Sequence, residues 1–431
     1  MCGPELNAGW CFPVLFLSPV VFPVWMKKRI PIQELRPVIV ITSLDQSWFK
    51  TPFLRHQWQV KRDDEITLLK SYGIQEVMID TDQGVDVVTE NLSESPPPRL
   101  QSPGNHPVSV LPALGPDPEA IESARILRAE AITTLDNFFR QIETPTAESL
   151  DEVRGVVGTL LDSMLDHRAA MISLIQMRRF DPDLASHGVD TGVLAMAIGQ
   201  EYNCDVLALK ALGLAALLHD IGQMRLPLNM VQKPTPYTPQ DHKLMEGHCE
   251  MGLAFLKDYS DIPEQSRQMI LAHHERLDGS GYPYQLKDTQ ISDLTQILSI
   301  ADTYDAQISG RCSAPPVPPA RALSELYRAA IAGQYHVNLV QLLIQLLGVY
   351  PIGSLVRLNT HEQAIVVWVS SHARMFPTIK LVKDAFGKPY KDHILLDLSA
   401  QGDETPRRTI AEALDPQREG WDVRQLLESL W

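Results

Sequence analysis

Histidine and aspartate recur at similar intervals through the middle of this 431-residue chain. The positions 187, 219, 248, 273 and 302 are separated by 25 to 32 residues, about the length of one helix and its return. Imidazole nitrogens and carboxylate oxygens bind Fe, Mn, Zn and Ni, so this spacing predicts a metal centre inside a helical bundle. Eight candidates are more than one ion needs, and we expect two or three divalent metal ions. The candidate ligands are Asp183, His187, His219, Asp220, His248, His273, His274 and Asp302.

Two adjacent pairs support this prediction. Neighbouring residues on a helix diverge by about 100°, so Asp220 could reach from the His219 position toward a second ion. Buried tandem histidines without a charge partner are costly, which favours a ligand role for His273 and His274. Asp183 is the weakest candidate, because it also suits the N-cap of the next helix.

The elements that must position these residues are helices. Asp117 suits an N-cap and Pro118 the first position of a helix. Apolar residues then recur at helical spacing, which predicts an all-α domain over residues 117–350 in a mainly α protein. The predicted helices are Glu119–Ile142, Glu148–Phe180, His187–Glu201, Val206–Ile221, Pro239–Asp258, Glu264–Glu275, Ile291–Ser309, Pro319–Ile331 and Val337–Leu347.

A small α/β accessory domain is predicted before this bundle, over residues 26–91. β-branched residues at 38–41 and the sequence EVMID at 76–80 predict strands. Residues 63–72 have helical periodicity and end before a glycine. Nothing in this segment has catalytic spacing.

Two further segments differ in composition from the bundle. Residues 92–116 are rich in proline, which predicts an extended linker. Residues 351–431 contain alternating and β-branched apolar stretches, which predict a short β extension and a tail at the C-terminus.

Residues 1–25 form an apolar extension of uncertain role. The apolar run is too short for a spanning helix, which needs about 20 residues, and three prolines interrupt it. We expect the functional start to be Met26 and expect no membrane association; a membrane-associated tail is the alternative.

Composition limits the classes of partner. Lys plus Arg is 38 and Asp plus Glu is 53, giving a net charge of −15. An acidic chain argues against long nucleic acid as a partner, because phosphate backbones need a basic track. The five cysteines are odd in number and lack a CxxC spacing, which favours free thiols and a cytoplasmic location.

Three motifs in the bundle resemble a known family. They are HDIG at His219–Gly222, HHERLDGSGYP at His273–Pro283 and ADTYDA at Ala301–Ala306. This pattern is similar to the HD-GYP subgroup of the HD phosphohydrolase superfamily, over about Asp183–Leu347. Residues 30–90 also resemble a small domain often found before it.

The resemblance implies an HD-type helical bundle and a phosphodiesterase. Its members hydrolyse the bacterial second messenger cyclic di-GMP to pGpG or on to GMP, with a two- or three-metal centre in which we expect Fe or Mn. By motif, the ligands would be His187, His219, Asp220, His248, His273, His274 and Asp302. Asp183 stands where some members carry a glutamate that completes a third metal site, and aspartate is one methylene shorter.

The GYP loop contains residues that form turns rather than ligands. Glycine permits positive φ and proline fixes the exit of a turn. Two interpretations stay open: a rigid turn that holds the helix after His274, or the contact surface for GGDEF-type cyclase partners that the family suggests. The loop residues are Gly279, Gly281, Tyr282 and Pro283.

The chain departs from the family pattern at two places. Gln223 stands where the family usually has a lysine, and glutamine can donate a hydrogen bond but cannot neutralise charge. Arg311 is kept, but Cys312–Pro316 replaces the segment that usually follows it. We assign catalytic roles to Asp220 and Gln223, and substrate binding to Arg311 and Gln223.

These departures leave alternatives open. The chain could be a catalytically weakened HD-GYP protein that acts as a cyclic di-GMP-binding or cyclase-binding scaffold. It could also be a mononuclear phosphohydrolase, although that class leaves His248, His273 and His274 unexplained.

Overall fold

The computed structural model describes most of the chain from residue 117 onward and short parts before it. The described residues are 27–35, 40–44, 58–59, 66, 70, 74–80, 117–141, 147–177, 183–231, 233, 235–311, 315–370, 373–391, 393–401 and 407–428. Two compact units, Met1–Asn105 and His106–Trp431, divide the chain. The predicted apolar extension at 1–25 and linker at 92–116 lie outside the described residues.

The first unit contains a four-stranded antiparallel sheet in the order β1-β4-β2-β3. The prediction of a strand at 76–80 is confirmed by β4, while the strand predicted at 38–41 is found as β2, shifted toward the C-terminus. Only Ile66 and Lys70 of the predicted helix at 63–72 are described. The elements are β1 (Lys27–Pro31), the 3₁₀ turn η1 (Ile32–Glu34), β2 (Val40–Leu44), β3 (Trp58–Gln59) and β4 (Glu76–Asp80).

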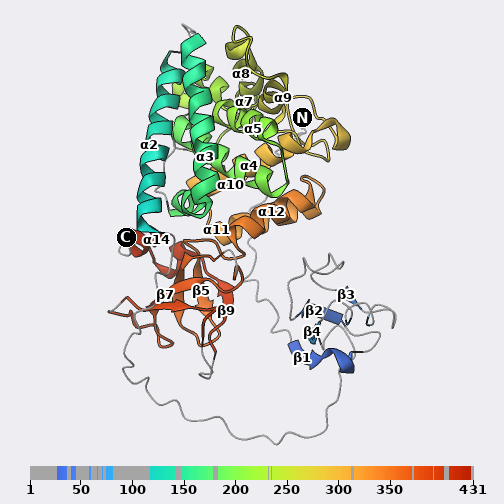
Figure 1. The fold of residues 1–431 in the computed structure, drawn as a ribbon, viewed down its shortest axis with the longest axis vertical. Helices are drawn as coiled ribbons and strands as arrows, with labels where there is room; N and C mark the ends of the chain where they lie inside the picture. The colour runs from blue at the N-terminus through green and yellow to red at the C-terminus, as the bar shows by residue number, and fades with distance from the viewer. Residues whose placement is uncertain are drawn as a thin grey trace, which may run out of the picture. The chain divides into compact units, whose positions relative to one another are not determined.

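The second unit begins with a bundle of helices, and α2 and α3 run side by side along it (Figure 1). Asp117 caps α2 by accepting a hydrogen bond from the backbone of Glu119, as the sequence predicted. The central helix is α4, whose residues 185–199 are all buried, because α2, α3, α5 and α10 pack around it. The first four helices are α2 (Pro118–Arg140), α3 (Ala147–Met177, kinked at His167), α4 (Leu184–Glu201) and α5 (Val206–Leu218).

The rest of the bundle consists mostly of shorter helices, apart from the 17-residue α10. The positions of α11 and α12 match their predicted ranges. The remaining elements are η3 (Ile221–Arg225), α6 (Leu228–Val231), α7 (Pro239–Glu246), α8 (His248–Leu256), α9 (Glu264–Ala272), η4 (Asp288–Gln290), α10 (Asp293–Ser309), α11 (Pro319–Ile331) and α12 (Val337–Leu347).

Four predicted helix ranges are wrong in the region of the candidate ligands. The helix predicted to start at His187 begins three residues earlier, since α4 starts at Leu184. The helix predicted over 239–258 is two helices that meet at Gly247. The prediction for 206–221 runs too far, because α5 ends at Leu218 and the chain continues as a 3₁₀ turn. The prediction for 264–275 also overruns, since α9 ends at Ala272. Each change of direction falls beside a candidate ligand.

A five-stranded antiparallel sheet follows the bundle, in the order β8-β7-β6-β5-β9. Apolar side chains pack on both of its faces, so its strands have almost continuous apolar sequences rather than strict alternation. The elements are β5 (Leu355–Leu358), β6 (Gln363–Trp368), β7 (Thr378–Lys383), β8 (Leu395–Asp397), β9 (Ile410–Ala413), α13 (Pro416–Glu419) and α14 (Val423–Glu428). The fold class predicted from the sequence, mainly α with a β extension, is confirmed.

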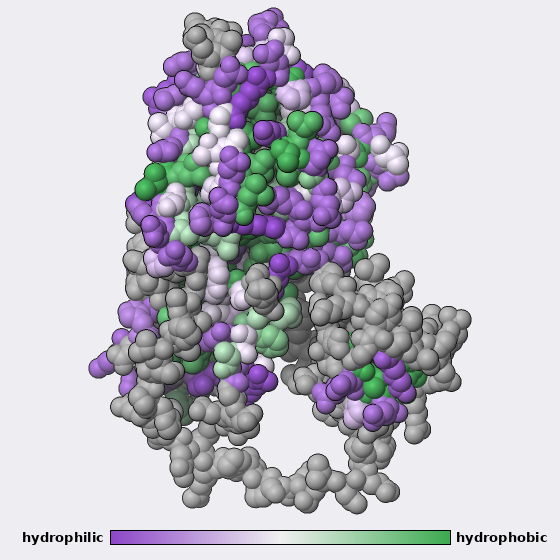
Figure 2. Space-filling view, viewed as in Figure 1, coloured by the Kyte–Doolittle hydropathy of each residue, from purple (hydrophilic) through white to green (hydrophobic). Residues whose placement is uncertain are grey.

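One described segment, Val206–Arg225, has the length and apolar character of a membrane span, but 78% of that window is buried inside the structure. Its composition is explained by packing against α4, α9 and α3. On the face drawn in Figure 2, hydrophilic residues cover most of the bundle and apolar residues form separate patches among them.

Candidate metal centre

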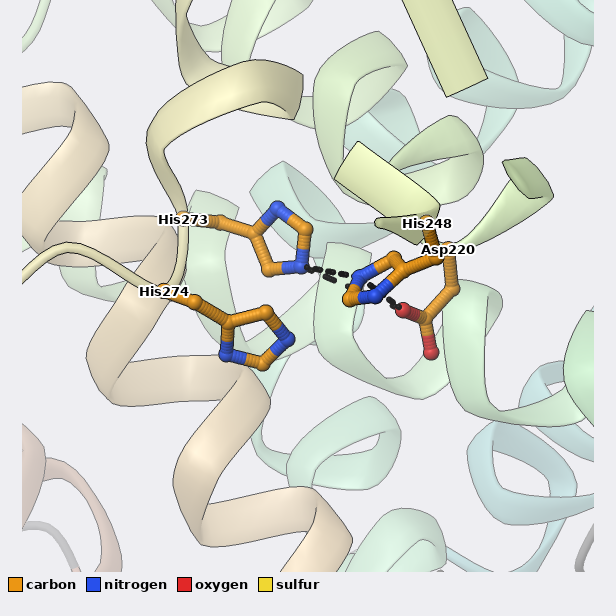
Figure 3. A group of neighbouring side chains, drawn as sticks. All are labelled: Asp220, His248, His273 and His274. Atoms are coloured by element: carbon orange, nitrogen blue, oxygen red, sulfur yellow. Dashed lines mark hydrogen bonds and ion pairs between the residues drawn. The ribbon is translucent and has the colours of Figure 1, made fainter. Parts of the chain in front are cut away.

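Seven of the eight predicted ligands gather into two neighbouring clusters. The first, here the His248 cluster, is Asp220, His248, His273 and His274; the second, the His187 cluster, is His187, His219 and Asp302. Within each cluster the ligand atoms lie within 4.8 Å of one another. Figure 3 shows the three imidazoles of the His248 cluster converging beside the Asp220 carboxylate.

Two carboxylates face both clusters. Asp220 Oδ1 lies 3.2 Å from His248 Nε2 and 3.9 Å from His273 Nε2, while Asp220 Oδ2 lies 3.6 Å from His219 Nε2. Asp302 Oδ1 lies 3.1 Å from His187 Nε2, and its Oδ2 lies 3.9 Å from His274 Nδ1. Each carboxylate therefore offers one oxygen to each cluster, which is the arrangement that two bridged ions need.

Helix ends position most of these side chains. His219 is the C-cap of α5, Asp220 begins the turn into η3, His248 is the first residue of α8 and His273 is the C-cap of α9. A side chain at a helix end can point along the helix axis into the centre of the bundle. Asp302 and His187 differ because they lie within α10 and α4.

The turn at η3 can pack closely against α8 because residue 222 is a glycine and has no side chain. A Cβ atom at Gly222 would lie 1.9 Å from the carbonyl oxygen of His248 and 2.5 Å from the backbone nitrogen of Gly252. Only glycine allows this approach, which brings the Asp220 carboxylate to the His248 imidazole.

Three imidazoles are oriented by the backbone one turn before them. The Nδ1 atoms of His219, His248 and His273 donate to the backbone carbonyl three residues earlier, at 2.7, 2.5 and 2.7 Å. This fixes the tautomer and leaves each Nε2 lone pair directed into the site. The Nε2 atom of His219 is buried and has no hydrogen-bond partner among the described residues, as expected of a nitrogen that binds a metal ion.

The protonation states also suit a divalent cation. Despite burial, the neighbouring His219 and the Arg311 guanidinium keep the pKa of Asp220 well below its usual value. The pKa of Asp302 is likewise low despite burial, through the hydrogen bond with His187 and the nearby imidazoles of His219 and His274. Burial lowers the pKa of His273 to about 3, so this imidazole is neutral. Ionised carboxylates beside the neutral His273 imidazole fit Fe, Mn or Zn.

Asp183 lies apart from both clusters. It is exposed at the start of α4, where its carboxylate accepts a hydrogen bond from the backbone of Ser186. It thus has the N-cap position that the sequence left open as the other interpretation. The third metal site at Asp183 stays a prediction.

The GYP loop lies against the metal centre rather than away from it. The Tyr282 ring stacks on the His274 imidazole, with centroids 4.6 Å apart and an angle of 31° between the planes. A Cβ atom at Gly281 would lie 2.5 Å from the backbone of Glu275 and Arg276, and Gly279 has a φ of +80°. The loop is therefore a tight turn packed on the end of α9, followed by Pro283.

An open cavity of about 280 Å³ adjoins both clusters. Arg311 lies in its wall with 8% of its surface exposed, donating to Asp220 Oδ2 at 3.0 Å and to Gln223 Oε1 at 3.2 Å. A guanidinium held beside the ligands can bind a phosphate oxygen. The lining also includes Met245, Tyr282, Thr303, Ala306, Gln307, Pro315 and Val317.

Two buried acidic residues near the site were not singled out in the sequence. Asp305 accepts a hydrogen bond from His187 Nδ1 at 2.6 Å. Glu275 accepts from the backbone of Tyr284 at 2.7 Å and of Leu286 at 2.9 Å, which anchors the GYP loop. The signal for Asp305 was its place three residues after Asp302 in a helix. The sequence carried no comparable signal for Glu275.

Comparison with known families assigns three parts of the chain. Residues 164–337 match the HD domain, and with the HDIG and DGSGYP sequences described above this decides the family. These residues form an HD domain of the HD-GYP group. In this HD-GYP protein, residues 27–153 match a domain of unknown function (DUF3391) and residues 355–419 match a KOW domain associated with the HD domain.

Several named proteins are similar to this HD-GYP protein. Cyclic di-GMP phosphodiesterase PA4108 of Pseudomonas aeruginosa is 28% identical over 94% of this chain and 96% of its own length. A cyclic di-GMP phosphodiesterase of Thermotoga maritima is 33% identical over 34% of this chain and 40% of its own. The 3'3'-cGAMP-specific phosphodiesterase 2 of Vibrio cholerae is 30% identical over 30% of this chain and 25% of its own.

Among solved structures, Bd1817, an HDG"Y"P protein from Bdellovibrio bacteriovorus, is 19% identical with a TM-score of 0.46. The match covers 74% of this chain and 98% of that one.

Proposed function

We propose that this chain is a metal-dependent phosphodiesterase that hydrolyses cyclic di-GMP to pGpG, GMP or both. The observation that carries the proposal is that Asp220 and Asp302 each present one oxygen to the His248 cluster and the other to the His187 cluster. The similarity to cyclic di-GMP phosphodiesterases over almost the whole chain supports the choice of substrate.

The two clusters would hold two divalent ions, for which we propose iron or manganese. When bound, such ions supply charge neutralisation for a phosphoryl oxygen and a water of lowered pKa. Asp220 would hold the two ions at a fixed separation, as would Asp302. Both carboxyl groups have a lowered pKa and are ionised. The buried imidazoles packed around them restrict the orientation of their oxygen atoms.

Arg311 and Gln223 would act on the substrate. The Arg311 guanidinium is the cation in the cavity wall nearest to Asp220, so we assign it to the phosphate of the dinucleotide. Gln223 accepts a hydrogen bond from Arg311 and so positions it. The apolar lining at Met245, Pro315 and Val317 excludes water around the phosphate.

Further parts of the proposal concern surroundings of the site. We propose that the protein is cytoplasmic. We also propose that its GYP loop contacts a GGDEF-type cyclase through Tyr284, which is exposed and lies two residues after Tyr282. The scaffold alternative has no observation in its favour, since the ligand sets are complete at seven positions. A mononuclear hydrolase would leave one of the two clusters without a role.

The test combines metal analysis with turnover on the same sample of full-length protein purified without oxygen. We expect about two ions per chain and hydrolysis of cyclic di-GMP. In the double variant His219→Ala, Asp220→Ala we expect loss of both, with helical content by circular dichroism unchanged. Turnover by the folded double variant, or a wild-type protein that binds no metal, would refute the proposal.

A further inference from the structure

Four ligand imidazoles form a hydrogen bond through Nδ1, but not all with the same kind of acceptor. They are His187, His219, His248 and His273. His219, His248 and His273 donate from Nδ1 to a neutral backbone carbonyl three residues earlier. His187 instead has its Nδ1 at 2.6 Å from Asp305 Oδ2, a carboxylate on another helix. His187 therefore differs from the others in having a charged group behind the ring.

Asp305 is built into the centre of the protein. It is fully buried on α10, three residues after Asp302, so the two carboxylates lie on the same face of one helix. His187 bridges them, because its Nε2 atom lies 3.1 Å from Asp302 Oδ1. One imidazole is thereby held at both nitrogens by side chains of α10.

A carboxylate behind a ligand imidazole has a known physical effect. It fixes the ring and the tautomer as a carbonyl does, and its charge also raises the basicity of the nitrogen that faces the metal. Removing such a group typically costs 10- to 100-fold in metal affinity. His248 and His273 are oriented by their own backbones, so this effect should be confined to the His187 cluster.

We propose that Asp305 is a positioning residue that strengthens metal binding at the His187 cluster and leaves the His248 cluster unaffected. The inference rests on the proposed two-ion site. Removal of the Asp305 charge should then weaken metal binding at the His187 cluster and not at the His248 cluster.

The test uses Mn²⁺ titration of the full-length protein, with free Mn²⁺ followed by electron paramagnetic resonance. Asp305→Asn keeps the shape and an acceptor oxygen but removes the charge. It is made in two backgrounds, His248→Ala, which removes a ligand from the His248 cluster, and His187→Ala. We expect Asp305→Asn to lower Mn²⁺ affinity about 10- to 100-fold in the His248→Ala background and to leave it unchanged in the His187→Ala background.

The matched control is Asp190→Asn. Asp190 is another fully buried aspartate, on α4 three residues after His187, but it pairs with Arg128 rather than with a ligand. We expect it to leave Mn²⁺ affinity unchanged in both backgrounds, which separates the effect of charge behind His187 from a general loosening of the fold.

Equal losses of affinity in the two backgrounds, or none in the His248→Ala background, would overturn the inference. A wild-type chain that binds no Mn²⁺, Fe or Zn would refute the proposed function first, so the two failures are distinguishable. If Asp305→Asn does not fold, proton NMR of the Zn²⁺-loaded wild type decides. We expect one imidazole N–H at lower field than the others and absent in His187→Ala; four equivalent imidazole protons would contradict the proposal.

Discussion

Replacing Gln223 with methionine removes the acceptor that holds Arg311 while keeping the length of the side chain. The Arg311 guanidinium donates to Gln223 Oε1 at 3.2 Å and to Asp220 Oδ2 at 3.0 Å, and both partners are buried. In Gln223→Met the guanidinium keeps one of these two contacts, so its position toward the substrate phosphate becomes less fixed.

The size of the effect follows from the hydrogen bond that is lost. A hydrogen bond to a charged group contributes about 1.5–3 kcal/mol, and each 1.36 kcal/mol corresponds to tenfold in rate. Full loss would lower kcat/KM by about 10- to 150-fold. Because Asp220 still holds the guanidinium, we expect the lower end, about tenfold.

A double-mutant cycle on cyclic di-GMP turnover tests this reasoning. Gln223→Met should lower kcat/KM about tenfold in the wild type and have little further effect in the Arg311→Met background, since the group that it positions is gone. Gln307→Met is the matched control: this glutamine lines the same cavity, and its Oε1 atom has no hydrogen-bond partner in the described part of the chain. Equal effects of Gln223→Met in both backgrounds would show that Gln223 does not act through Arg311.

Three other perturbations have expected outcomes. Gly281→Ala should destabilise the protein by about 1–3 kcal/mol, because the new Cβ would lie 2.5 Å from backbone atoms. Gly155→Ala, on the open surface of α3, should instead stabilise the protein by about 0.5–1 kcal/mol. Equal unfolding temperatures for the two variants would contradict this prediction. Glu275→Gln leaves one loop N–H facing an amide group and should cost about 1.5–3 kcal/mol in urea unfolding, so an unchanged midpoint would argue against the anchor. Removal of metal by a chelator should lower Tm, since an ion at 100 times its Kd adds about 2.7 kcal/mol; the His219→Ala, Asp220→Ala variant should show no such change.

The spacing of histidines and aspartates predicted the bundle and the site because ligands are tied to chemistry rather than to helix propensity. The structure brings seven of the eight candidates together, including the tandem His273 and His274. Asp183 stands apart because a residue before a helix can serve either as cap or as ligand, and the sequence does not distinguish these roles.

The sequence did not predict where the helices end beside His219, His248 and His273. Neither of the two residues after Leu218 is a proline or a glycine, yet α5 ends there. The chain turns because the His219 imidazole and the Asp220 carboxylate are both directed inward, which is a tertiary requirement that local propensity does not contain. Glu275 was missed for a similar reason, since a glutamate in a charged segment gives no sign that it is fully buried.

The carbonyl acceptors behind three of the imidazoles have a consequence for variation in the sequence. The acceptors belong to Ala216, Met245 and Ile270, but only their peptide groups take part, so the amino acid at these positions has no influence on how the ring is set. A substitution at these three positions should leave the carbonyl acceptors in place, provided that the new side chain fits the core and the local backbone is kept. Asp305 has no such freedom, because there the acceptor is the side chain itself.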